Sequence, residues 1–308
     1  MSVFERVSGI LSQLIDRGEI KKEDFQLFQS YSLSRLTSFR TGGDSTVLFP
    51  EKLTLVEKVV PRFHEENIPY FVLGNGTNVI AKDEGYDGVI LSLSHLKEAR
   101  VEGKRLIAQC GASITALSNL AQKNSLSGME FFYGIPGTVG GAVFMNAGAY
   151  GGECKDILES VAILTREGSI KSLSVEELNL GYRTSIFQQT GELILSAVFS
   201  LTEGKKEEIR STMEDLMERR IAKQPLEYPS AGSTFRRCEG RFTAKMIEDA
   251  GLKGTRRGGA QVSEKHAGFL INYDHATSAD IFDLIDHVKE VIWEKEGVRI
   301  QCEIRVIE

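Results

Sequence analysis

Cysteine is scarce in this 308-residue sequence, which has four, at positions 110, 154, 238 and 302. They form no Cys-x-x-Cys pair, and the five histidines form no His-Glu-x-x-His motif, so neither a zinc site nor a disulfide framework is indicated. We therefore expect no metal, and a reducing compartment such as the cytoplasm.

An excess of basic residues and a long apolar helix are also missing. The formal charge of −6 argues against a broad nucleic-acid surface. Residues 1–20 have apolar positions at helical spacing interrupted by Glu5, Arg6 and Asp16, which predicts an amphipathic helix and not a signal peptide. The 22 uncharged residues of 131–152 include a proline, an asparagine and glycine pairs, which disfavour a membrane span. We expect no nucleic-acid partner, no membrane association and a monomer.

Glycine, in contrast, is concentrated in two loops. Residues 134–152, GIPGTVGGAVFMNAGAYGG, contain seven glycines, where an average composition of about 7% gives about one. Glycine suits positive φ or close approach of the main chain to another surface, so tight packing without a ligand and contact with a ligand are both open. The second loop, LGNGTN at 73–78, follows the apolar segment YFVL and could bind a pyrophosphate or make a simple turn. It matches neither GxGxxG nor a P-loop.

The distribution of apolar residues predicts a mixed α and β protein. Short strand candidates alternate with turns and helices between residues 45 and 203. A charged helix near 205–223 then breaks at Pro225, which suggests a domain boundary. A long helix should begin at a Ser278 cap and end at Gly297, followed by a strand over 298–307 whose polar face carries Glu303.

Three segments together resemble a known family: TSFRTGG at 37–43, LGNGTNVIAKDEGYDGVI at 73–90 and the glycine-rich stretch 134–152. The likeness continues through GYRTSIF at 181, AGSTFRR at 231, IEDAGLKG at 247, GGAQVSEKHAGFLIN at 258 and CEIRVIE at 302. In order and content these motifs are similar to those of the UDP-N-acetylenolpyruvoylglucosamine reductases, from about residue 31 to the end.

The resemblance implies an α+β fold: a two-subdomain FAD-binding module of the vanillyl-alcohol-oxidase type, followed by a smaller α+β substrate-binding domain. The corresponding boundaries are an N-terminal helical extension at 1–30, the FAD-binding domain at 31–204 (subdomains 31–103 and 104–204) and the substrate domain at 205–308. FAD would be held without a covalent bond. The residues implied to contact it are Arg40, Gly74, Asn75, Gly76, Thr77, Asn78, Gly134, Ile135, Pro136, Gly137, Thr138, Gly140 and Gly141.

The implied reaction reduces an enolpyruvyl double bond on a UDP-sugar, with NADPH as hydride donor. Arg183 matches the family's catalytic arginine, Ser233 its proton donor and Glu303 its third catalytic residue. A fixed guanidinium suits a carboxylate on which charge grows, and a hydroxyl is acid enough to protonate a strongly basic carbon. Without the motifs, Arg183 could equally clamp a loop and Ser233 could make a turn.

The substrate's diphosphate and carboxylate need cations and polar contacts, for which we consider Tyr182, Lys223, Arg236, Arg237, Arg256 and Lys265; a solvated rim is the alternative for each. Where many family members read FKNP or FKRP after the serine, this chain reads FRRCEG. The short distance between Arg183 and Ser233 indicates the subgroup that lacks a tyrosine-bearing substrate loop. Another FAD-dependent oxidoreductase on the same scaffold, or a non-catalytic flavin- or nucleotide-binding protein, are the alternative functions.

Overall fold

The computed structural model describes residues 1–308 and divides into two compact units. Unit 1 comprises Met1–Gln29, Thr46–Asn75 and Gly88–Glu218, and unit 2 comprises Ser30–Ser45, Gly76–Asp87 and Arg219–Glu308. The chain therefore passes between the units several times. The domain boundaries expected from the sequence describe a different partition and stay a prediction.

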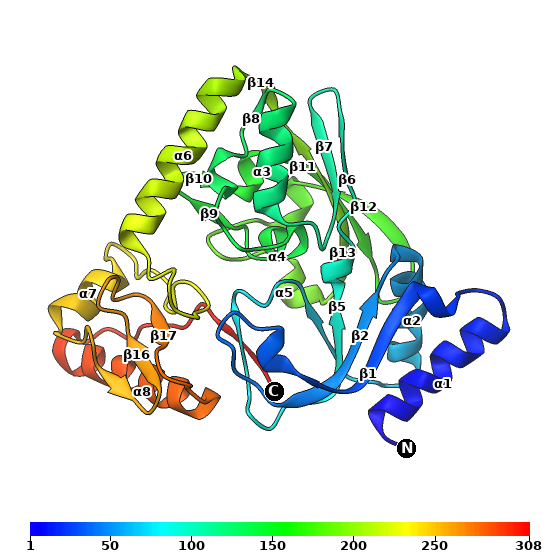
Figure 1. Ribbon diagram of the computed structural model, residues 1–308, viewed down its shortest axis with the longest axis horizontal. Coiled ribbons are helices and arrows are strands. Elements are labelled where there is room, and N and C mark those ends of the chain that lie inside the picture. The colour runs from blue at the N-terminus through cyan, green and yellow to red at the C-terminus, as the bar shows by residue number, and fades with distance from the viewer. The chain divides into compact units, whose positions relative to one another are not determined.

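The N-terminal residues belong to the core of unit 1. Helix α1 (Val3–Asp16) begins with a capping box between Ser2 and Glu5, and its buried face contacts α2 (Leu53–Glu65). The two helices lie together in Figure 1. The amphipathic helix expected from the sequence is confirmed, and its apolar stripe is covered by protein: Val7, Ile10, Leu11 and Leu14.

A four-stranded sheet contains the strands on either side of the first glycine-rich loop. Its order is β1 (Phe25–Ser32), β2 (Asp44–Pro50), β5 (Tyr86–Ser92) and β3 (Tyr70–Leu73). Strand β3 runs parallel to β5, with Tyr70 opposite Val89. Because β3 ends at Leu73, its pairing with β5 fixes the position at which the loop 74–78 begins.

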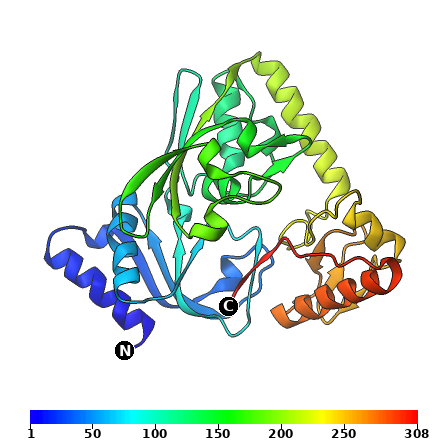
Figure 2. The ribbon, with the colours of Figure 1, turned by 180° about the vertical axis from the view of Figure 1, so that it is seen from behind.

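The second sheet of unit 1 is antiparallel and five-stranded. Its order is β12 (Ile170–Ser174), β11 (Leu158–Leu164), β13 (Leu193–Ser200), β7 (Arg105–Gln109) and β6 (Ala99–Glu102). It is seen from behind in Figure 2. Helices α3 (Ile114–Lys123) and α4 (Val139–Phe144) contribute to the same core, and α4 contacts β13 and β7.

The remaining elements of unit 1 are short, apart from a long charged helix. They are β8 (Leu126–Ser127) with β14 (Thr202–Glu203), β9 (Gly148–Ala149) with β10 (Gly152–Glu153), and α5 (Phe187–Thr190). Helix α6 (Lys206–Lys223) then leads into unit 2. No helix of the molecule has both the length and the apolar character that a membrane span requires.

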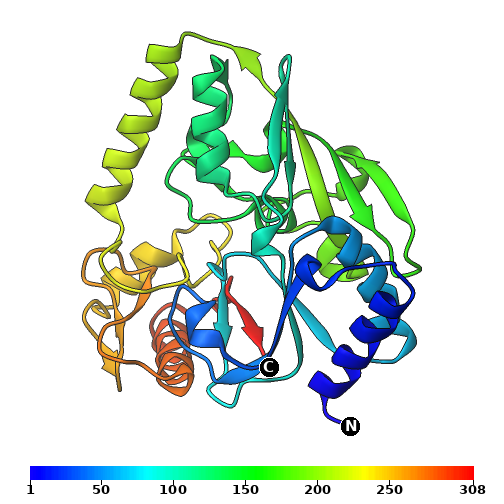
Figure 3. The ribbon, with the colours of Figure 1, turned by 45° about the vertical axis from the view of Figure 1, so that its right-hand side comes forward.

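Unit 2 has its own core around α7 (Thr243–Asp249) and α8 (Ser278–Glu296). A three-stranded antiparallel sheet contains β15 (Arg256–Arg257), β16 (Ala260–Val262) and β17 (Leu270–Asn272). Near the C-terminus, β18 (Arg305–Ile307) pairs in parallel with β4 (Val79–Ala81), directly after the first glycine-rich loop (Figure 3).

The start of α8 differs from the sequence prediction. The N-cap is Thr277, in a capping box with Asp280, and not Ser278. The Ser278 side chain is used elsewhere: its hydroxyl donates to Asp83 at 2.8 Å, and its main-chain amide donates to the same carboxylate at 3.0 Å. The expected stop at Gly297 is confirmed, with φ of 64°.

The strand expected over 298–307 is wrong for most of its length, because only Arg305–Ile307 form β18. The main chain here changes partners: the Glu303 amide donates to the Thr234 carbonyl, and the Arg305 amide donates to the Asn78 carbonyl. Ile300 and Ile304 are buried as the alternation predicts, whereas Ile307 is buried out of phase with it. Glu303 therefore lies in a connecting segment and not on the polar face of a strand.

Candidate active site

The first glycine-rich loop meets the second within unit 1. A Cβ at Gly74 would overlap the buried hydroxyl of Thr138, so only glycine fits there. The Asn75 side-chain amide donates to the Pro136 carbonyl at 3.4 Å. Two segments that the resemblance assigns to one cofactor are thus in contact, through the Asn75 and Thr138 side chains.

The same loop continues into unit 2 at Gly76, where it is anchored to the segment that carries Arg40. Both the amide and the hydroxyl of Ser38 donate to the Gly76 carbonyl, at 3.0 and 3.2 Å. Gly76 has φ of 61°, and a Cβ there would overlap the Leu36 carbonyl. Arg40 is exposed and left-handed, and Thr77 is half-buried.

The second loop contains a short helix that the sequence analysis missed. Thr138 is the N-cap of α4, with its hydroxyl accepting from the Gly141 amide at 3.4 Å. Gly134, with φ of 79°, and Ile135, whose carbonyl accepts from Thr115 at 2.9 Å, lead into it. The signal was present, because Thr138 precedes the apolar Val139, but the glycine pair hid it.

Several glycines of this segment serve protein packing. The Gly140 amide donates to the Cys110 carbonyl at 2.8 Å, and a Cβ there would lie 3.2 Å from Cys110 Cβ. A Cβ at Gly152 would lie 2.6 Å from the Phe131 ring. The packing interpretation that the sequence left open is therefore correct for these two positions.

Gly137 and Gly141 are different. A Cβ at Gly137 would come no closer than 3.4 Å to Ile114, and one at Gly141 would meet only the Thr138 hydroxyl, at 3.5 Å. Neither position has a positive φ. Protein contacts therefore do not require glycine at these two sites, which fits a flat ligand lying against the bare main chain. In this respect the loop fits FAD.

Arg183 lies close to the end of the second glycine-rich segment. Its guanidinium donates to the Gly148 carbonyl at 3.3 Å and lies 5.3 Å from the centre of the exposed Tyr182 ring. Its own carbonyl accepts from the Gln188 side chain at 3.0 Å, and its φ is 54°. A non-glycine residue held in this left-handed conformation is uncommon and is frequent at functional sites.

Asn146 is a site residue that the sequence reasoning missed. It is fully buried with φ of 41°, and its side-chain amide donates to Glu153 and to the Gly181 carbonyl, both at 3.0 Å. Its side-chain oxygen accepts from the Lys155 amide at 3.0 Å. Asn146 thereby fixes the chain just before Tyr182 and Arg183. A polar residue inside an uncharged run was the available signal.

Glu153 shares this hydrogen-bonded group. The hydrogen bond from the Lys155 ammonium, followed by the one from Asn146, holds the pKa of the Glu153 carboxyl below its ordinary value. The charge of Arg183 acts in the same direction. The Glu153 side chain is therefore an ionised carboxylate at neutral pH.

Ser233 and Glu303 are brought together in unit 2. The Glu303 amide donates to the carbonyl of Thr234, the residue after Ser233, at 2.9 Å. The Glu303 carbonyl in turn accepts from the Asn78 side chain at 3.3 Å. Ser233 pairs with Phe269 in an isolated bridge, and its hydroxyl makes a long 3.4 Å hydrogen bond to the Phe235 carbonyl. A hydroxyl this weakly held can turn toward a ligand.

The cationic candidates have varied surroundings. Arg236 has a buried Nε with no hydrogen-bond partner, which is the orphaned donor expected of a ligand contact. Arg256 lies 3.8 Å from the Tyr273 ring centre, and Lys265 pairs with Glu227 at 3.7 Å. Arg237 lies over Phe242, and Lys223 is exposed at the end of α6. Their substrate roles stay predictions.

Comparison with protein families gives two matches. Residues 224–307 match the profile "UDP-N-acetylenolpyruvoylglucosamine reductase, C-terminal domain", and residues 45–174 match "FAD binding domain". The latter range includes both glycine-rich loops. The predicted fold, a FAD-binding module followed by a smaller substrate domain, is confirmed.

Individual proteins agree with these matches. The UDP-N-acetylenolpyruvoylglucosamine reductase of Clostridium novyi (strain NT) is 47% identical over 298 residues, covering 96% of this chain and 95% of its own. That of Lactiplantibacillus plantarum is 45% identical over 290 residues and covers 94% of both chains. The crystal structure of the Thermus caldophilus reductase has a TM-score of 0.81 at 30% identity, covering 92% of this chain and 100% of its own.

Proposed function

Because the chain belongs to the UDP-N-acetylenolpyruvoylglucosamine reductase family, we propose that it reduces UDP-N-acetylglucosamine enolpyruvate to UDP-N-acetylmuramate with NADPH. FAD is its cofactor, and the pathway is peptidoglycan precursor synthesis. The observation that supports the proposal is the hydrogen bond from the Glu303 amide to the Thr234 carbonyl, because it joins the segment that carries the Ser233 hydroxyl to the segment that carries the Glu303 carboxyl.

The two glycine-rich loops would hold FAD, which would supply a ring able to take hydride from the nicotinamide and pass it to the terminal CH2 carbon of the enolpyruvyl group. The chain's own task is to stabilise the negative charge that then develops on the neighbouring carbon and its carboxylate. Arg183 suits this task because its guanidinium stays charged and can bind a carboxylate through two donors. Its bond to the Gly148 carbonyl holds it beside the end of the second glycine-rich loop.

Ser233 delivers the proton to the carbon that carries the carboxylate. Its long bond to the Phe235 carbonyl leaves the hydroxyl able to rotate toward this carbon. Glu303 would repel the developing charge if it were ionised and uncompensated, so we expect it to be protonated or balanced by a guanidinium, that of Arg183 or Arg305. Replacement of Glu303 by Gln would then shift the pH dependence of the rate, and an unaltered profile would remove Glu303 from the chemistry.

The polar and cationic candidates would bind the substrate's diphosphate. Arg236 has the best support among them because its buried Nε lacks a partner. We assign the weaker candidates the same role: Tyr182, Lys223, Arg237, Arg256 and Lys265. We further propose that the protein acts as a monomer in the cytoplasm, which light scattering and fractionation would check.

Substrate-dependent oxidation of NADPH tests the proposed function. The purified protein should be yellow and should oxidise NADPH rapidly only when UDP-N-acetylglucosamine enolpyruvate is present. Mass spectrometry should show a product heavier than the substrate by two hydrogens. A colourless protein, or NADPH oxidation that ignores the UDP-sugar, would contradict the proposal, and the latter result would favour another flavin-dependent oxidoreductase.

A further inference from the structure

A loop formed by residues 263–268 supports the main chain at Ser233. The Thr234 amide donates to the Gly268 carbonyl at 2.8 Å, and the Leu270 amide donates to the Thr234 hydroxyl at 3.2 Å. The Ser233–Phe269 bridge lies between these two bonds in sequence. The position of Gly268 therefore helps to fix the main chain next to Ser233.

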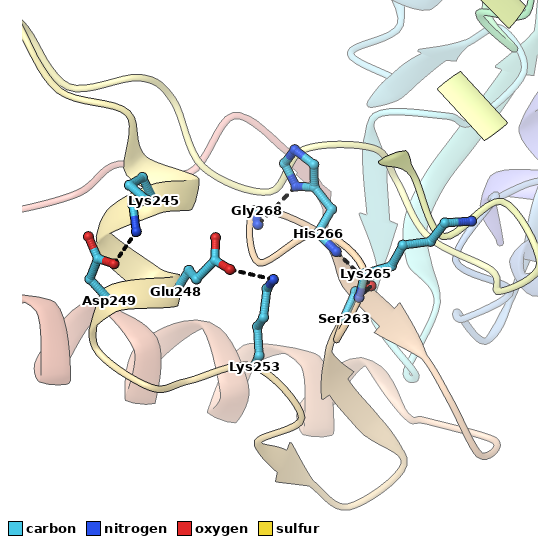
Figure 4. A network of polar contacts seen from close by, with 8 residues as sticks. All are labelled: Lys245, Glu248, Asp249, Lys253, Ser263, Lys265, His266 and Gly268. Atoms are coloured by element: carbon cyan, nitrogen blue, oxygen red, sulfur yellow. Dashed lines mark hydrogen bonds and ion pairs between the residues drawn. The ribbon is translucent and has the colours of Figure 1, made fainter. Parts of the chain in front are cut away.

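His266 fixes the position of Gly268. Its Nδ1 accepts from the Gly268 amide at 3.1 Å, as Figure 4 shows. The ring makes an edge contact with Phe269, with centroids 4.9 Å apart. A Cβ at Gly268 would lie 3.0 Å from the His266 ring and 3.1 Å from Ala244, so the peptide is closely enclosed. The two sides of one residue, Gly268, thus link His266 to Thr234.

The turn that carries His266 is stabilised by hydrogen bonds to Ser263. Ser263 is buried, and its hydroxyl accepts from the amides of Lys265 and His266 at 3.2 and 3.3 Å. These bonds set the position of the imidazole and leave its Nδ1 directed at a main-chain N–H. Since an N–H can only donate, Nδ1 must be unprotonated for this bond to exist.

We propose that His266 is a positioning residue for Ser233: the neutral imidazole, with its hydrogen on Nε2, accepts the Gly268 amide and so holds the peptide that aligns the proton donor. This role rests on the proposed function, because it supposes that Ser233 delivers a proton. It also makes proton delivery dependent on the charge of His266, since a second ring proton would place two donors face to face.

The surroundings of His266 favour its neutral form. Burial is the largest influence, and it lowers the pKa of His266 below its ordinary value of 6.5. A main-chain hydrogen bond acts in the opposite direction and raises the pKa. Lys253 and Lys223 also lower the pKa, while Glu248 raises it. Glu248 is itself paired with Lys253 at 2.7 Å.

The direction of the pH effect follows. The bond is intact at neutral pH and is lost as the pH falls below 6.5 through the lowered pKa. We therefore expect reduction of the UDP-sugar, the step that uses Ser233, to slow as the pH falls below 6.5. The step in which NADPH bleaches the flavin does not use Ser233 and should not follow this titration.

Two variants separate positioning from packing. His266→Leu keeps an apolar body but has no acceptor, whereas His266→Asn places an amide oxygen where Nδ1 lies and does not titrate. For His266→Leu, stopped-flow mixing should show recolouring of the flavin by the UDP-sugar slowed about tenfold at neutral pH. FAD content and bleaching by NADPH should be as in the wild type. His266→Asn should restore most of the recolouring rate and should lack the acid limb.

Two results in these assays would overturn the proposal: recolouring by His266→Leu at the wild-type rate, or an unaltered acid limb in His266→Asn. The ¹⁵N spectrum of the wild-type holoenzyme provides a second measurement that needs no stable variant. It should show Nδ1 of His266 unprotonated and Nε2 protonated, and the opposite tautomer would contradict the proposal. Absence of UDP-sugar reduction by the wild type would contradict the proposed function instead.

Discussion

The predicted site residues fall into two groups that are held in place by different means. In unit 1, Arg183 and its neighbours depend on side chains that bond to carbonyls, chiefly Asn146 and Gln188. In unit 2, Ser233 and Glu303 depend on main-chain pairs. Substitutions in the first group should therefore disturb structure and activity together, whereas substitutions in the second should change the chemistry and leave the fold intact.

The largest effect is expected for Ser233→Ala, which tests the second half of this comparison. Loss of the acid should slow reduction of the UDP-sugar by about 10² to 10⁴, because the hydroxyl is the proposed proton source. FAD binding and the unfolding midpoint should not change, since the main-chain pairs of Ser233 do not involve its side chain. Ser230→Ala, in the same loop, is the control. Loss of FAD from the Ser233 variant would show a structural role.

Asn146→Ala tests the first half. The change removes three hydrogen bonds of a buried residue with φ of 41°, and should lower the free energy of unfolding by about 2–4 kcal/mol. Activity should fall as well, because the chain before Arg183 loses its anchor. Urea denaturation and steady-state assays would measure both. Asn179→Ala is a matched control, because Asn179 is also left-handed but exposed. Equal losses in the two variants would contradict the role of Asn146.

Gly141→Ala sharpens the comparison within the glycine-rich loops. Alanine at this exposed helical position should raise or maintain the stability of the apoprotein, by up to about 1 kcal/mol. FAD affinity should nevertheless fall about tenfold, a loss of about 1.4 kcal/mol, because the added methyl group would occupy the face left for the ring. Fluorescence titration with FAD would measure it. Gly140→Ala, which crowds Cys110, should instead lower stability. Unchanged FAD affinity in Gly141→Ala would place the cofactor elsewhere.

The smallest expected effect is on the pH dependence of stability that Glu153 contributes. Because the folded pKa of Glu153 lies below its ordinary value of 4.5, its contribution to stability is complete above that pH and is lost as the pH falls through the folded pKa. Glu153→Gln should therefore lower the slope of unfolding free energy against pH on the acid side. Glu207→Gln, at an exposed position of α6, should leave this slope unchanged. Identical slopes for both variants would show that the Glu153 carboxylate contributes nothing to stability through its hydrogen bonds with Asn146 and Lys155.

Much of the fold could be predicted because the relevant signals are local. The N-terminal helix, the strand before the first glycine-rich loop and the Gly297 stop all follow from spacing and capping residues. The extent of the C-terminal strand could not be predicted, because the main chain there pairs with Thr234 and Asn78, far away in sequence. The Ser278 cap failed for a similar reason, since Asp83 binds its hydroxyl.

The glycines show the same limit at the site. Their density predicted bare main chain, but the sequence could not say which glycines serve packing and which are left for a ligand. That distinction needs the neighbours: Cys110 beside Gly140 and Phe131 beside Gly152, but only ordinary contacts at Gly137 and Gly141. Asn146 and His266 were missed because hydrogen bonds across a turn or between distant segments leave no periodic pattern.

A single-turnover experiment in D2O tests most directly whether residues of both groups act on one substrate. Enzyme reduced with NADPH is mixed with UDP-N-acetylglucosamine enolpyruvate, and recolouring of the flavin and the deuterium position in the product are measured. We predict rapid recolouring with deuterium on the carbon that bears the carboxylate, and slow recolouring in both Ser233→Ala and Arg183→Lys. Recolouring at the wild-type rate in either variant, or deuterium on the terminal carbon alone, would contradict the account.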